Sequence, residues 1–84
     1  MTLPDWPDAL PTWTIYFNAT DYPGKFVVRR FVILGGGRGL HKDAEPCFVG
    51  DSLEAARDSL PHERGLYCMP RQAGDEPQIV ETWI

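Results

Sequence analysis

The sequence has few basic residues and no long hydrophobic segment. Eight lysines and arginines stand against twelve aspartates and glutamates, which gives a formal net charge of −4 and a pI near 4.9. A dedicated DNA- or RNA-binding domain is usually basic, so this balance argues against one. The longest apolar run covers residues 31–34, far short of the roughly 20 residues that a membrane-spanning helix needs.

Cysteine is also scarce, because Cys47 and Cys68 are the only two in the chain. The first residues lack the basic region followed by an apolar one that marks a secretory signal peptide. We therefore expect a cytoplasmic protein with both thiols reduced. The 84 residues, 43% of them hydrophobic and 12% aromatic, predict one small folded domain whose aromatic side chains supply much of the core.

Proline and glycine divide the chain. Pro4, Pro7 and Pro11 fall within the first eleven residues, where they disfavour helix and interior strand. We therefore predict a proline-rich arm over residues 1–11 and a single α+β domain over residues 12–84. Four glycines within residues 35–39 predict that residues 35–46 form a loop.

Residue periodicity within the domain predicts strands and one helix. Apolar alternation and β-branched residues favour strands at 12–18, 25–34, 47–49, 66–69 and 78–84, with a turn at 21–24. Asp51 and Glu54 have the spacing of a capping box, and Pro61 ends the helix. The expected fold is a small antiparallel sheet of four to five strands, in the order β-β-β-α-β-β, with the helix packed on one face.

The predicted helix separates apolar from acidic residues. Leu53, Ala56 and Leu60 share one face, and three carboxylates lie within about 60° of one another on the opposite face. This row is either a solvated outer surface or a set of charges presented to a basic partner, where it would imitate phosphates. The row consists of Asp51, Glu54 and Asp58, and the second-line candidates on loops are Asp43, Glu45, Asp75 and Glu76.

No reactive cluster stands out in the sequence. The glycine-rich loop lacks the Gly-Lys-Ser/Thr ending of a phosphate-binding loop. His41 and His62 each precede a cysteine by six positions, a looser spacing than zinc ligands usually have. We therefore predict no catalytic residue, metal or cofactor, and a small Cys/His-dependent enzyme or metal-binding protein remains an alternative.

Two arginines interrupt the longest predicted strand. Arg29 and Arg30 point to opposite faces of the sheet, so at most one of them can join a given surface patch. We expect them to pair with acids on neighbouring strands, such as Glu81, rather than to bind nucleic acid.

The sequence resembles a group of small uncharacterised bacterial and prophage-type proteins over roughly residues 12–84. That resemblance implies no activity. A weaker resemblance, in size, charge and lack of a reactive cluster, is to anti-CRISPR proteins of phages, some of which mimic DNA. The segments that carry the first resemblance are Trp13-Thr14-Ile15-Tyr16, Asp21-Tyr22-Pro23, Phe26-Val27, Arg29, Phe31, Ser52-Leu53-Glu54, Arg57, Leu60-Pro61, Gly74-Asp75-Glu76-Pro77, Ile79-Val80-Glu81 and Trp83-Ile84.

These observations predict a non-enzymatic acidic protein that binds a protein partner with a basic surface. Its most specific form is a phage-type, DNA-mimicking inhibitor of a host nucleic-acid-binding complex, for example a CRISPR effector. We expect no membrane association and no direct nucleic-acid binding, and either a monomer or a homodimer. A dimer-forming structural accessory protein, whose edge strand at 78–84 pairs with its copy, is a further alternative.

Overall fold

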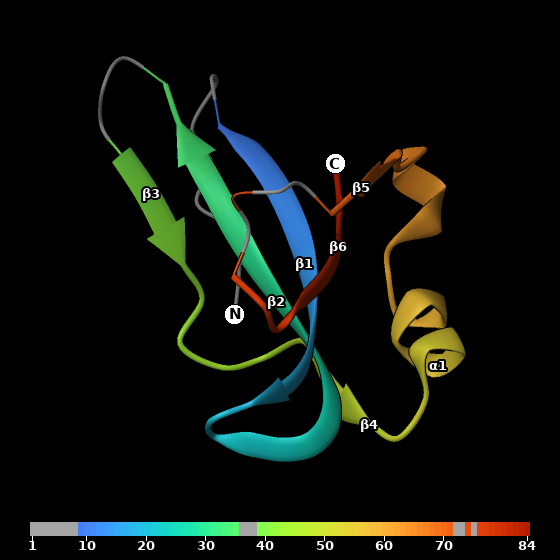
Figure 1. Cartoon of the computed structure of the whole chain (residues 1–84). Coiled ribbons are helices and arrows are strands. Elements are labelled where there is room, and N and C mark those ends of the chain that lie inside the picture. The colour runs from blue at the N-terminus through green and yellow to red at the C-terminus, as the bar shows by residue number, and fades with distance from the viewer. Residues whose placement is uncertain (1–8, 36–38, 72–73, 75) are drawn as a thin grey trace.

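The computed structural model describes residues 9–35, 39–71, 74 and 76–84, and an antiparallel sheet dominates these segments (Figure 1). Its path runs β3-β2-β1-β6-β5, and a sixth strand, β4, also pairs with β2. The elements are β1 (Leu10–Ala19), β2 (Tyr22–Leu34), β3 (Gly39–Lys42), β4 (Phe48–Gly50), α1 (Leu53–Asp58), the 3-10 helix η1 (His62–Arg64), β5 (Cys68–Pro70) and β6 (Ile79–Trp83).

The predicted α+β fold with four to five strands and one packed helix is wrong, because the described chain is a six-stranded sheet with a helix of only six residues. The extra strand is β3, which lies inside the predicted loop. It pairs with the second half of β2, from Phe31↔Lys42 to Leu34↔Gly39. The long β2 offers backbone groups that need hydrogen-bond partners, and the segment after the glycines supplies them.

The helix starts one residue later than the capping-box spacing indicates. Ser52, not Asp51, is the N-cap, with an extended backbone and a side-chain oxygen that accepts a hydrogen bond from the Ala55 amide at 3.0 Å. Serine is among the preferred residues at this position because its short side chain reaches the free amides of the first turn. The helix ends at Asp58 with Ser59 as its C-cap, which limits α1 to less than two turns.

The β1–β2 hairpin turns earlier than predicted. Ala19 pairs with Tyr22, so Thr20 and Asp21 form the turn, and Tyr22 already belongs to β2. The register shifts just before this turn, between Phe17 and Ala19, where Asn18 adopts a positive φ of 61° and its side-chain oxygen accepts a hydrogen bond from the Gly24 amide at 2.7 Å. Of the predicted turn residues 21–24, only Asp21 lies in the turn, and residues 22–24 belong to β2.

The core that holds α1 lies on one face of the sheet. Ile15 and Val28, which pair across β1 and β2, are fully buried there. Ala56 and Leu60 pack against them, and Leu53 is partly buried at the same cluster, so the predicted inward face of the helix is confirmed. Figure 1 shows α1 on the opposite side of the molecule from β3.

The first and last strands also differ from expectation. Residues 1–8 of the predicted arm lie outside the described residues, but Leu10 and Pro11 already belong to β1. A proline is tolerated there because β6 pairs with β1 only from Trp13 onward. The predicted edge strand at 78–84 is wrong, since β6 lies between β1 and β5. Among the described residues, no helix is long and apolar enough to cross a membrane.

Candidate functional site

A buried carboxylate ties the helix to the sheet. Glu81 in β6 is only 7% exposed, and it accepts hydrogen bonds from Arg57 Nε at 2.6 Å and Arg57 Nη2 at 3.1 Å. The Trp83 indole donates to the same carboxylate at 3.2 Å. The hydrogen bonds from Arg57 hold the pKa of Glu81 below its ordinary value, against the effect of burial. The pair fixes which side of α1 faces the solvent.

The predicted pairing of the strand arginines with Glu81 is therefore wrong. Arg29 instead pairs with Asp21 at 2.6 Å, and Arg30 with Asp43 at 2.7 Å. Asp21 and Asp43 are the carboxylates within reach of these arginines in the folded chain, whereas Glu81 forms its ion pair with Arg57 of α1. The two arginines do lie on opposite faces, as alternation along a strand requires.

The carboxylates predicted on the outer face of α1 differ in whether a cation is paired with them. Glu54 and Asp58 are exposed, one helical turn apart, and neither makes a salt bridge or side-chain hydrogen bond with the described residues. Asp51, which precedes the helix, pairs with Lys25, and its side chain is 82% exposed. Two of the three predicted carboxylates are thus presented without a paired cation.

The second-line acidic residues do not join this row as a group. The Asp43 side chain is only 14% exposed and lies between Arg30 and His41, whose Nε2 is 3.4 Å away. Glu45 is exposed, and Glu76 is exposed beside a pocket described below. Asp75 lies outside the described residues. Asp43 is therefore a structural partner rather than a free surface charge.

Both cysteine thiols have a raised pKa. The Cys68 thiol lies 3.6 Å from the Glu81 carboxylate, and burial followed by the charge of Glu81 raises its pKa. Desolvation of the Cys47 sulfur raises its pKa as well, and the charge of Asp43 adds to this effect. A raised pKa keeps a thiol protonated, whereas nucleophilic catalysis needs the thiolate.

The histidines do not assemble with the cysteines either. The His62 ring donates a hydrogen bond from Nε2 to the Arg57 carbonyl at 2.7 Å and meets Trp83 edge-on. Within the part of the chain that the structure describes, no group of three or more His, Cys, Asp or Glu residues could hold a metal ion. The geometry thus gives no support to the Cys/His enzyme or metal-binding alternative.

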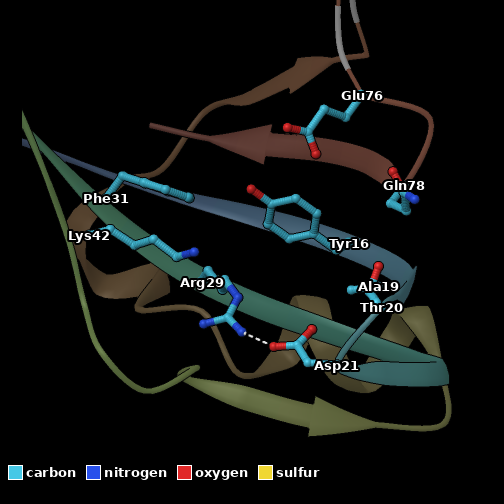
Figure 2. Close-up of a pocket in the computed structure, with 9 residues that line it drawn as sticks. All are labelled: Tyr16, Ala19, Thr20, Asp21, Arg29, Phe31, Lys42, Glu76 and Gln78. Carbon is cyan, nitrogen blue, oxygen red and sulfur yellow. Dashed lines mark hydrogen bonds and ion pairs between the residues drawn. The ribbon is translucent and has the colours of Figure 1, made fainter.

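The opposite face of the sheet carries a pocket of about 360 Å³ that the sequence reasoning missed. Figure 2 shows Lys42, Arg29 and Glu76 around the Tyr16 ring. One signal was present, since Arg29 and Phe31 lie two positions apart in β2 and therefore share a face of the sheet. The decisive residue, Lys42, comes from a strand that was predicted as a loop. The lining consists of Tyr16, Ala19, Thr20, Asp21, Arg29, Phe31, Lys42, Glu76 and Gln78.

No family model matches the chain, and no curated protein or solved structure is significantly similar to it. The resemblance to small bacterial and prophage-type proteins therefore stays a prediction.

Proposed function

We propose that this chain is a non-enzymatic interaction protein of the cytoplasm, which binds a partner with a basic surface through the outer face of α1. One observation carries the proposal: Glu54 and Asp58 are exposed and unpaired within the described chain, on a helix whose other side is fixed to the sheet. Two neighbouring carboxylates held in this way attract lysine and arginine side chains.

Four cations of the described chain are engaged by carboxylates other than Glu54 and Asp58. Arg57, the basic residue between the two carboxylates in sequence, reaches across to Glu81 instead. Three further cations are engaged by carboxylates outside the pair, so the helix face keeps its negative charge. These ion pairs are Lys25 with Asp51, Arg29 with Asp21, and Arg30 with Asp43.

The position of Asp58 is unfavourable for the fold, whereas Glu54, in the first turn, is favoured by the positive end of the helix. Glu54 and Asp58 are like charges at i and i+4, which destabilises a helix by about 0.2–0.5 kcal/mol. Asp58 is also the last helical residue, where the partial negative charge of the helix end repels a carboxylate. A residue that lowers stability in this way supports a role in binding rather than in folding.

The specific form of the proposal is a phage-type inhibitor of the anti-CRISPR kind. Four helical residues rise about 6 Å along the axis, which is close to two phosphate steps of about 3.4 Å on one DNA strand. The two carboxylates thus match alternate phosphates of one strand, which a basic groove of a host nucleic-acid-binding complex, such as a CRISPR effector, would pair with its lysines and arginines. The small size and the net charge of −4 fit this role.

Charge reversal tests the binding face. Affinity capture from the host should recover a partner with the wild-type chain, and Glu54→Lys/Asp58→Lys should weaken that complex and reduce its salt dependence. The matched control is Glu45→Lys/Glu63→Lys, which changes the net charge equally at exposed sites that belong neither to the row on α1 nor to the pocket. An equal loss with the control would mean that net charge, not α1, carries binding.

Competition tests the specific form. If the partner normally holds nucleic acid in the bound groove, duplex DNA or the partner's own RNA should displace the wild-type chain from the purified complex. A complex that forms equally well on the nucleic-acid-loaded partner would exclude mimicry while leaving the interaction itself intact.

A further inference from the structure

The pocket on the face opposite α1 is built from separate parts of the chain. Tyr16 comes from β1, Arg29 and Phe31 from β2, and Lys42 from β3, where it pairs directly with Phe31. The segment before β6 closes the pocket with Glu76 and Gln78. Its volume of about 360 Å³ lies at the lower end of the range for small-molecule sites, roughly 300–1,000 Å³.

One part of the pocket is cationic. Lys42 makes no salt bridge with the described residues, and it lies on the same side of the Tyr16 ring as Arg29 in the view of Figure 2. The Arg29 side chain is 13% exposed, and Asp21 occupies only its Nη2 atom, at 2.6 Å. The remaining N–H donors of the guanidinium fork are available to an anion, and a fork beside an ammonium suits a phosphate group.

The rest of the lining differs in chemistry. Tyr16 and Phe31 offer aromatic surface, on which a nucleobase stacks favourably. Glu76 lies on the other side of the Tyr16 ring from Arg29 in the view of Figure 2, and it makes no salt bridge with the described residues. Its carboxylate only accepts hydrogen bonds when ionised, so it favours a ligand group with N–H donors.

We propose that this pocket binds a single nucleoside 5′-monophosphate whose base carries an exocyclic amino group. The phosphate lies at Lys42 and Arg29, the base lies on Tyr16 and Phe31, and the amino group donates to Glu76. A longer strand fits poorly, because the described lining of the pocket holds only these two cations and the chain has a net charge of −4. This site is separate from the proposed protein-binding face and does not depend on it.

Ligand truncation and matched variants test each contact. Titration calorimetry on the 84-residue chain with CMP, UMP, cytidine and ribose 5-phosphate should give the tightest binding for CMP. Lys42→Met should weaken CMP about tenfold, the usual effect of losing one charge-assisted hydrogen bond, and leave cytidine unchanged. Glu76→Gln should abolish the preference for CMP over UMP. Glu63→Gln, an exposed residue of η1, is the control and should change neither.

Three results would overturn the proposal or a part of it. Ribose 5-phosphate binding as tightly as CMP would overturn the role of the aromatic residues and reduce the site to an anion contact. CMP binding that ignores Lys42→Met, or no binding of CMP at millimolar concentration, would overturn the proposal. Thermal unfolding of Lys42→Met, whose side chain is at the surface, checks that the variant folds.

Discussion

Replacing Glu81 should loosen the link between α1 and the sheet. Its carboxylate accepts two hydrogen bonds from the Arg57 guanidinium, at 2.6 and 3.1 Å, and one from the Trp83 indole at 3.2 Å. Glu81→Gln keeps the size of the side chain but removes the charge and one of the two acceptor oxygens. The variant therefore isolates the electrostatic part of this contact from its packing.

The expected loss follows from the burial of the carboxylate. A hydrogen bond to a charged group contributes about 1.5–3 kcal/mol when both partners are buried. Glu81 is buried, but the guanidinium that it holds is half exposed, so water recovers part of the loss. We expect Glu81→Gln to lower the free energy of unfolding by about 1–2 kcal/mol at neutral pH, which corresponds to a decrease in Tm of roughly 5–15 °C.

The pH dependence of this loss gives the sharper test. The folded-state pKa of Glu81 lies below its ordinary value of 4.5, so the ionised carboxylate stabilises the native state. That contribution is fully present above the ordinary value and disappears as the pH falls through the lowered pKa. The stability difference between wild type and Glu81→Gln should therefore be constant from about pH 6 to pH 8 and shrink below about pH 4.5.

Urea unfolding followed by tryptophan fluorescence measures this difference, and Trp83 lies beside the substituted group. Glu63→Gln, at an exposed position in η1, serves as the control and should cost little at any pH. A Glu81→Gln deficit as large at pH 3 as at pH 7 would refute the reasoning, because the effect would then come from shape rather than charge.

Two further predictions concern the helix start and the thiols. Ser52→Ala should lower the free energy of unfolding by about 1 kcal/mol in urea melts, and no change would show that the bond from the Ala55 amide at 3.0 Å does not stabilise α1. Cys47 and Cys68 should react with a disulfide reagent at about pH 8 more slowly than free cysteine, because both thiol pKa values are raised. Glu81→Gln should speed the reaction of Cys68 alone, and faster modification of both wild-type thiols than of free cysteine would contradict the assignment.

The strands that the sequence predicts well are those with strong local patterns. The alternation of Trp13 and Ile15 with polar residues identifies β1, and the β-branched run around Val28 identifies β2. The short β3 has no such pattern, because it exists through pairing with β2 rather than through its own residues. The number of strands therefore cannot be predicted from periodicity alone where a short segment becomes a strand only by hydrogen bonding to a long neighbouring strand.

For the candidate sites too, the sequence predicts what local spacing determines and misses what long-range pairing determines. The carboxylates of α1 could be placed on one face because helical spacing is local. Which of these carboxylates would lack a paired cation could not be predicted, because Lys25 and Arg57 pair with carboxylates 26 and 24 residues away in the sequence. The pocket was missed for a related reason: Lys42 reaches it only through β3.

Ion pairing within the fold explains how a chain with a net charge of −4 carries one acidic surface and one partly cationic surface. On the α1 side, Arg57 is held by a buried carboxylate, which leaves Glu54 and Asp58 exposed without a paired cation. On the other face, Asp21 holds Arg29 by one nitrogen, which leaves a cationic region beside Lys42. Because the sheet separates the two surfaces, each can be altered by exposed substitutions that leave the other in place. Loss of partner binding would therefore not count against the nucleotide pocket, and an empty pocket would not count against the acidic face.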